Sequence, residues 1–324
     1  MAGITASKAL AKWFEGKEMA LAMGLEMALA RVGVFFIFTI SPRIAGIGGA
    51  NPDVVRPVAF CTALLLIGLL CYTIFCLMDK KFDKQLGETA TGESEEEFKI
   101  GDIGKIFSSR LFWIVAMLCV LYYSAIFPFQ KFAANMLQSN LGISATAASD
   151  IFRWFPIGAA LITPFLGWFL DRKGKGATML ILGSLLMIIC HTTFALVLPV
   201  VPSKTVAFAA IILLGISFSL VPAALWPSIP KIMDKRYLGS AYSLIFWVQN
   251  FGLSGTPIMI GYALEKTNPG VAEQIAAGVE GATYNYTVPM LLFASLGVLA
   301  LLFALWLKAD DARNHYGLEQ PNIK

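Results

Sequence analysis

Charged residues are scarce in this chain. Asp, Glu, Lys and Arg make up 14% of the 324 residues, whereas soluble domains carry roughly a quarter. This shortage excludes an ordinary soluble domain, and the apolar share of 57% and the mean hydropathy of +0.70 agree with it. Because helices satisfy their backbone hydrogen bonds internally in lipid, the composition predicts an all-α integral membrane protein.

Histidine and cysteine are also few, and common catalytic motifs are missing. The five cysteines lie inside apolar stretches, without a C-x-x-C pair or a histidine at metal-ligand spacing. The chain has no H-E-x-x-H, no G-x-S-x-G and no Gly-rich phosphate loop with its lysine. Its basic residues flank apolar stretches and form no patch with interleaved aromatic residues. The sequence therefore predicts no enzyme, no metal or cofactor, and no nucleic-acid partner.

Long apolar runs, in contrast, are abundant. Each is long enough to cross a bilayer and is bounded by charge or by Pro and Gly. We predict eight membrane spans, near residues 19–42, 56–78, 111–136, 151–170, 177–199, 205–229, 239–263 and 286–307. An even number of spans places both termini on the same side of the membrane.

Lysine and arginine are distributed unevenly between the two sets of connecting segments. The set that contains both chain ends holds 18 of the 25 Lys and Arg residues. The opposite set holds only four, which are Arg43, Arg56, Lys204 and Lys266. Since basic residues accumulate in cytosolic loops, both termini are predicted to be cytosolic.

An internal repeat appears when the chain is shifted by 219 positions. The segment Trp13–Leu25 then lies over Ile232–Leu244, so that two charged turns lead into two similar helices. The same offset pairs two polar residues and two glycines, Arg31 with Asn250 and Gly33 with Gly252. A parallel repeat is typical of transporter bundles built from two halves. Chance similarity between two interfacial turns is the alternative.

A short charged turn at 167–175 separates two of the apolar runs. Gly167 is expected to permit close helix approach, and Gly174 a tight turn. The pattern G-x-x-x-D-R-x-G-K resembles the cytosolic loop signature of the major facilitator superfamily, carried here by Gly167, Asp171, Arg172, Gly174 and Lys175. In that family the Asp–Arg pair ties the loop to neighbouring helix ends in one conformation and releases it in the other. A plain positive-inside anchor is the other interpretation.

Other stretches are similar to one branch of that superfamily, the lysosomal dipeptide carriers. These stretches are Lys12–Glu18, Ala30–Gly33, Tyr122–Phe129, Leu225–Pro227 and Gln249–Leu253. The resemblance covers nearly the whole chain and assigns its spans to helices five to twelve of a twelve-helix fold. Helices one to four would then be absent, so the chain is expected to be a fragment of a carrier.

The resemblance also implies a division into domains. The parts are a remnant of the N-terminal bundle (1–78), a cytosolic linker (79–110), a six-helix C-terminal bundle (111–308) and a cytosolic tail (309–324). The end of the linker has the spacing of a short amphipathic helix on the membrane surface. Its polar part, 82–97, fits a disordered tether equally well.

Arg31 is the first candidate for contact with a substrate. It follows Glu18 by thirteen residues, which places it ~20 Å into the bilayer at the helical rise per residue. A charge there costs at least ~2.5 to 3.5 kcal/mol and usually faces a bundle interior or a watery cavity. The guanidinium suits a carboxylate, and the resemblance implies that it binds the C-terminal carboxylate of a dipeptide. A fixed ion pair is the alternative.

Further polar and aromatic residues lie at membrane depth. Glu26 is about 140° around the helix from Arg31, and it either lines the cavity, carries a coupling proton or stays hydrated near the interface. Of Tyr122 and Tyr123, one should face the cavity and the other should pack, next to a helix loosened by Pro128.

Three candidates remain in the last third of the chain. Gln249 and Asn250 either bind a peptide group or staple neighbouring helices. Trp226 is either a cavity wall or an interfacial anchor.

The sequence thus predicts a secondary-active or facilitative carrier that moves a small organic solute, with a dipeptide as the expected substrate, by alternating access. The alternatives are a non-transporting assembly subunit and a carrier for another small organic anion. The expected partners are the substrate, the lipid bilayer, and either the missing N-terminal helices or an accessory membrane subunit. A bacterial inner membrane or a lysosomal membrane is the expected location.

Overall fold

The computed structural model describes residues 19–47, 52–86, 100–233, 237–279 and 281–321. These residues form helices and turns, and no strand occurs among them. The helices are α2 (Met19–Ile44), α3 (Val55–Leu86), α4 (Ile100–Phe107), α5 (Arg110–Leu141), α6 (Ala145–Phe152), α7 (Trp154–Lys173), α8 (Gly176–Thr192), the π-helical turn η2 (Thr193–Val197), α9 (Lys204–Ile232), α10 (Leu238–Thr267), α11 (Val271–Ala276) and α12 (Thr287–Asn314).

Six helical stretches in the described part are long and apolar enough to cross a membrane. They are α3, α5, the α6–α7 pair, α8 with η2, α9 and α12. The predicted spans at α2 and α10 have 26 and 30 residues, which is also enough to cross the hydrocarbon core. α10 carries two polar residues, Gln249 and Asn250, near its middle. The chain is an all-α, multi-pass membrane protein.

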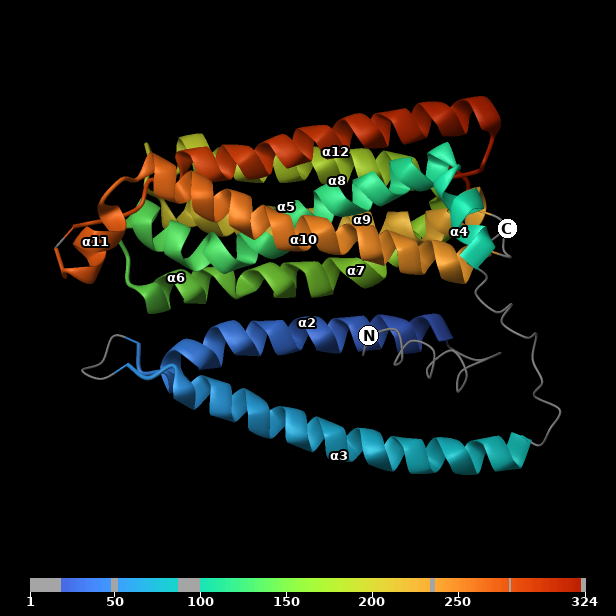
Figure 1. Cartoon of the computed structure of the whole chain (residues 1–324), viewed down its shortest axis with the longest axis horizontal. Helices are drawn as coiled ribbons and strands as arrows, with labels where there is room; N and C mark the ends of the chain where they lie inside the picture. Colours follow the sequence, from blue (N-terminus) through green and yellow to red (C-terminus); the bar gives the residue numbers. More distant parts are fainter. Residues whose placement is uncertain (1–18, 48–51, 87–99, 234–236, 280, 322–324) are drawn as a thin grey trace.

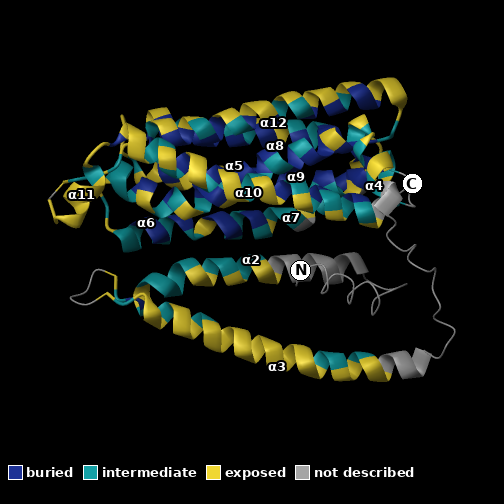
Figure 2. Cartoon of the chain, in the orientation of Figure 1, coloured by how far each residue is buried: buried dark blue, intermediate teal, exposed yellow. Residues whose placement is uncertain are grey.

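The long helices lie side by side in one bundle made of α5, α7, α8, α9, α10 and α12 (Figure 1). α2 and α3 form a hairpin beside this bundle, and α2 is the helix of the hairpin that packs against α7. Figure 2 shows that burial concentrates in the bundle, whereas α3 is largely exposed along its length. The face of α2 toward α7 is therefore where the two parts of the chain meet.

The connecting segments gather at two opposite ends of the molecule (Figure 1). α11 and the turn between α5 and α6 lie at one end, which we call the α11 end. α4, the turn between α7 and α8 and the C-terminus lie at the other, which we call the tail end. The connecting segments at the tail end belong to the group of loops that is rich in lysine and arginine, and those at the α11 end belong to the group that is poor in them. That the tail end faces the cytosol stays a prediction, and so does the division into domains, whose linker includes residues 87–99 outside the described part.

The predicted span at 151–170 begins earlier in the structure and is broken. Ser144 caps α6 by accepting a hydrogen bond from the backbone N–H of Ala147 at 3.3 Å, so the helix begins before the apolar run does. The helix is interrupted at Arg153 because Pro156 has no backbone N–H that could donate a hydrogen bond to the carbonyl of Phe152. Two helices, α6 and α7, stand where the sequence predicted one.

α9 stays helical through three prolines, Pro222, Pro227 and Pro230. Each of them withholds a hydrogen bond from the carbonyl four residues earlier. For Pro230 that carbonyl belongs to Trp226, and the Tyr242 hydroxyl of α10 donates to it at 3.1 Å. A side chain of the neighbouring helix thus replaces a missing backbone donor, as membrane helices require.

Candidate functional site

Arg31 lies midway along α2, on the face toward α7 and α9. Its Nη1 donates to the carbonyl of Ala159 at 2.6 Å and to Ser219 Oγ at 3.1 Å, and it also donates to the Thr163 hydroxyl. Ala159 and Thr163 belong to α7, and Ser219 belongs to α9. One half-buried guanidinium, midway along α2, therefore joins three helices.

All of these partners of Arg31 are electrically neutral. In the part of the chain that the structure describes, no carboxylate forms an ion pair with Arg31. Arg43 and Arg153, in contrast, both pair with Asp150 at the α11 end, at 3.4 and 3.0 Å. A charge buried without a counter-charge is costly. The guanidinium is therefore free to gain stability from an anion.

The hydroxyls around Arg31 form a network of their own. Ser219 Oγ donates to the Ala159 carbonyl at 2.9 Å, and Thr163 Oγ1 donates to the same carbonyl at 2.6 Å. α7 and α9 come close enough for this because Gly215 has no side chain: a Cβ there would lie 2.5 Å from the Phe155 carbonyl oxygen. The network fixes the hydroxyls, and they in turn orient the guanidinium.

Aromatic rings continue from Arg31 toward the tail end. The Arg31 guanidinium carbon lies 5.3 Å from the centroid of the Phe218 ring, within cation–π range. We call the following five residues the aromatic platform: Tyr123, Phe127, Phe218, Trp226 and Phe246. In it Phe218 meets Phe127 edge-on at 5.5 Å, and Phe127 stacks on Tyr123 at 5.5 Å.

Trp226 occupies the far side of the aromatic platform. Its indole Nε1 donates to the Tyr123 hydroxyl at 3.2 Å, and its ring stacks on Phe246 of α10 at 4.8 Å. Tyr123 is linked to Arg31 through the rings of Phe127 and Phe218. Among the residues singled out in the sequence, the structure thus brings together Arg31, Tyr123 and Trp226.

Tyr122 points elsewhere. Its side chain is fully buried, and its hydroxyl lies 2.6 Å from Ser217 Oγ and also donates to the Ser217 carbonyl. Ser217 Oγ donates onward to the Gly183 carbonyl of α8 at 2.8 Å. Tyr122 is therefore the packing member of the tyrosine pair, and it joins α5, α8 and α9.

Gln249 and Asn250 do not join the cluster around Arg31. Gln249 is only 4% exposed, and its Oε1 has no hydrogen-bond partner. Asn250 is exposed and donates to the Phe246 carbonyl of its own helix at 2.7 Å. The side chains of Glu26 and Asp171 lie outside the described residues, so their roles stay predictions.

The loop signature forms the turn between α7 and α8. Gly174 has a φ of 70° and Lys175 a φ of 71°, so the tight turn passes through two successive residues with positive φ, of which Gly174 adopts a conformation that favours glycine. Arg172 lies over the Trp168 ring at 5.3 Å. The close helix approach expected at Gly167 is not observed, because a Cβ there would meet no atom within 4 Å.

Sequence reasoning did not single out Thr163, Ser219, Phe218 or Phe246, and it included Phe127 only within the stretch Tyr122–Phe129. Small hydroxyl residues in apolar helices commonly mark helix contacts, and that signal alone points to Thr163 and Ser219. The chain has 24 phenylalanines, so the sequence does not show which of them lie near Arg31.

Comparison with known proteins gives several relatives. The chain is 29% identical over 259 residues to the lysosomal dipeptide transporter MFSD1 of Danio rerio. The aligned segment covers 78% of this chain and 54% of that protein. For human MFSD1 the identity is 28% over 263 residues, with the same coverage of 78% and 54%. A probable sulfoacetate transporter, SauU of Cupriavidus necator, is 24% identical over 324 residues, 92% of this chain and 68% of that protein.

The chain thus spans about half the length of the MFSD1 proteins that it matches. A profile of the Major Facilitator Superfamily matches residues 1–254 and 129–322, so the two matches together cover nearly the whole chain. Helical bundle, loop signature and profile agree with one another, and the chain belongs to the Major Facilitator Superfamily.

Proposed function

We propose that this protein is part of a membrane carrier for a small organic solute that bears a carboxylate, and that Arg31 binds this carboxylate. The observation that carries the proposal is the set of neutral partners around Arg31, which are the Ala159 carbonyl and the hydroxyls of Thr163 and Ser219. They orient the guanidinium without cancelling its charge. An incoming carboxylate would find a donor fork already in place.

Dipeptides are the substrate class that we favour. The MFSD1 relatives are named as dipeptide transporters, and the aromatic platform beside Arg31 gives an apolar surface for a peptide side chain. The anion of a dipeptide would then lie at Arg31 on α2, and its side chain against Tyr123 and Trp226 on α5 and α9. Alternating access would follow from movement of α2 relative to α7 and α9 around the bound solute.

A small organic anion without a peptide bond is the second candidate. The relative named as a probable sulfoacetate transporter matches 92% of the chain, and the neutral setting of Arg31 suits any small anion. An assembly subunit that does not transport is the third. The position of both termini in the cytosol, and a lysosomal or bacterial inner membrane as location, belong to the same proposal.

Uptake into proteoliposomes separates these candidates. The purified protein would be tested with a labelled dipeptide, with the same dipeptide as its C-terminal amide, and with sulfoacetate. We expect saturable uptake of the dipeptide and at least ~10-fold weaker uptake of the amide, because the amide leaves a buried guanidinium unpaired. Uptake of sulfoacetate alone favours the second candidate. Equal uptake of dipeptide and amide contradicts the role of Arg31, and absence of any flux favours the assembly subunit.

A further inference from the structure

The chain folds back on itself after α12. His315, with a φ of 56°, ends the helix and donates its backbone N–H to the Asp311 carbonyl at 2.8 Å. Gly317, with a φ of 83°, starts a turn that is closed by the Gln320 N–H donating to the Gly317 carbonyl at 3.1 Å. We call residues His315–Gln320 the C-terminal clasp.

The C-terminal clasp holds the first turn of α8. The backbone N–H groups of Lys175 and Gly176 donate to the carbonyls of Glu319 and Leu318 at 3.1 and 3.0 Å. The Glu319 carboxylate accepts a hydrogen bond from the Thr178 N–H at 2.7 Å. These are the orphan donors of a helix start, and α8 has no side-chain cap of its own. The clasp supplies that cap, with a negative charge at the positive end of the helix dipole.

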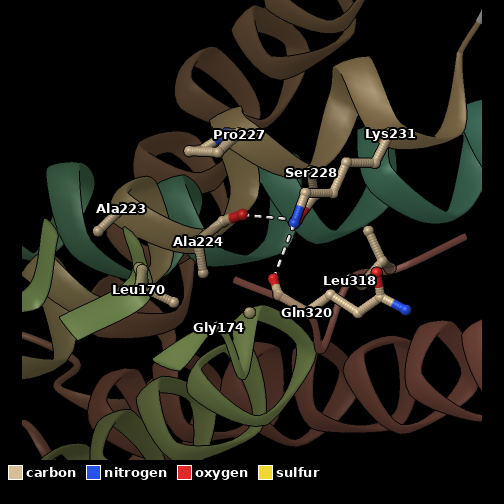
Figure 3. A pocket seen from close by; sticks show the side chains of 10 residues that line it. Leu170, Gly174, Ala223, Ala224, Pro227, Ser228, Lys231, Leu318 and Gln320 are labelled. Atoms are coloured by element: carbon tan, nitrogen blue, oxygen red, sulfur yellow. Dashed lines mark hydrogen bonds between the residues drawn. The ribbon is translucent and has the colours of Figure 1, made fainter. Parts of the chain in front are cut away.

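The same clasp holds the last turn of α9. Lys231 Nζ donates to the carbonyls of Gly317 and Gln320 at 3.0 and 3.1 Å, and Figure 3 shows its side chain reaching down to the Gln320 carbonyl. Leu318 is 1% exposed. Gly174 lies directly against the clasp, and a Cβ there would collide with Gln320. The groove beneath is lined by Leu170, Ala223, Ala224, Pro227 and Ser228.

The segment of α9 that the clasp holds is weak in hydrogen bonds. Three prolines within its last eleven residues, at 222, 227 and 230, each remove a backbone bond. Such a segment opens more readily than a regular helix unless contacts outside the helix hold it. It also carries Trp226, one turn before Lys231, and the Trp226 indole completes the aromatic platform.

We propose that the C-terminal clasp fixes the last turns of α9 in the position in which Trp226 completes the aromatic platform, with Lys231 as the positioning residue. Lys231 touches no substrate in this account. It acts through the backbone of α9, and its release from Gly317 and Gln320 frees the proline-rich turns to move at the tail end. The effect of Trp226 on substrate binding rests on the proposed function. The stabilisation of the last turns of α9 by Lys231 does not depend on it.

Hydrogen–deuterium exchange on the purified chain in detergent tests, without any substrate, whether Lys231 stabilises the last turns of α9. In Lys231→Met we expect amides of 222–233 to exchange ~10-fold faster, which corresponds to loss of hydrogen bonds from a charged donor. Lys231→Arg should restore slow exchange, because the guanidinium can reach the same carbonyls. The matched control is Lys204→Met, at the opposite end of α9, which should leave 222–233 unchanged.

A chain that ends after Tyr316 removes Gly317–Gln320, the part of the clasp that contacts α8 and α9, without altering α9. It should show the same fast exchange in 222–233 and also lose protection at the start of α8. Wild-type exchange of 222–233 in both Lys231→Met and the shortened chain overturns the proposal. If neither variant folds, Lys231→Gln and Glu319→Gln are the milder replacements. Exchange of 222–233 in Lys231→Gln as slow as in the wild type also overturns the proposal.

Dipeptide binding distinguishes this inference from the proposed function. If Trp226 is positioned through Lys231, the dipeptide concentration at half-maximal thermal stabilisation rises ~10-fold in Lys231→Met and returns to normal in Lys231→Arg. An unchanged half-maximal concentration in Lys231→Met, together with loss of binding in Arg31→Gln, contradicts the positioning of Trp226 and leaves the proposed function standing. Fast exchange in Lys231→Met without any dipeptide binding to the wild type supports the clasp and contradicts the proposed function.

Discussion

The indole of Trp226 donates to the hydroxyl of Tyr123 at 3.2 Å, across the contact between α9 and α5. Both rings are half-buried. Tyr123 stacks on Phe127, Phe127 meets Phe218 edge-on, and the Arg31 guanidinium of α2 lies over the Phe218 ring. The bond therefore joins Trp226 to the row of rings that leads to Arg31.

Tyr123→Phe removes the acceptor of the Trp226 indole and keeps the ring. We expect a loss of about 1 kcal/mol in stability, and weaker dipeptide binding because Trp226 is no longer held. Thermal unfolding with and without dipeptide measures both effects. Tyr286→Phe is the control, since its hydroxyl bonds Asn135 at 2.7 Å near the α11 end, and it should cost stability while leaving binding unchanged. Equal binding by both variants would remove Tyr123 from the site.

Tyr122→Phe should lower the stability of the protein and leave dipeptide binding unchanged. The fully buried hydroxyl bonds Ser217, so its removal leaves Ser217 short of one partner and costs about 1 to 3 kcal/mol. Binding should not change, because Tyr122 packs between α5, α8 and α9, away from Arg31. The measurement is again thermal unfolding over a series of dipeptide concentrations. A larger effect on binding than on stability would contradict the assignment of Tyr122 to the core.

The glycines paired by the sequence repeat should differ in their tolerance of a methyl group. In Gly252→Ala the new Cβ would lie 2.7 Å from Val120 Cγ1 and would collide with the Ser124 hydroxyl, so we expect a loss of about 1 to 3 kcal/mol. In Gly33→Ala the Cβ would meet no atom within 4 Å, and the gain in helix propensity, up to about 1 kcal/mol, should appear as unchanged or higher stability.

Unfolding midpoints of the two variants, compared with the wild type, decide this prediction. Equal destabilisation by both substitutions would mean that Gly33 also lies in a tight contact. Gly252→Ala combined with Ser124→Ala should recover part of the loss, because the hydroxyl that collides is then absent.

Much of the fold could be predicted from the sequence because long apolar runs have few alternatives in lipid. The tight turn at Gly174 followed from its glycine, whereas the depth of Arg31 in the membrane stays a prediction. The break at Arg153 was missed, although Pro156 signals it, because the apolar run continues through the break and hides the helix boundary.

The neighbours of Arg31 could not be predicted in the same way. Adjacent residues on a helix point about 100° apart, so only the packing of α5 against its neighbouring helices decides that Tyr122 is buried and that Tyr123 belongs to the aromatic platform. Thr163 and Ser219 are isolated hydroxyls in apolar runs, and such residues bond their own helix as readily as a partner. The clasp was missed because it is a short polar tail without periodicity, and its contacts are made through backbone carbonyls.

Thermal stabilisation of the purified chain by a dipeptide and by its C-terminal amide, in the wild type and in Arg31→Gln, tests the central claim most directly. Arg153→Gln, which removes an arginine paired with Asp150, is the control. We predict that only the free carboxylate raises the unfolding temperature, and that Arg31→Gln, unlike Arg153→Gln, abolishes this rise. A rise of the same size in Arg31→Gln, or with the amide, would contradict the binding of a substrate carboxylate by Arg31.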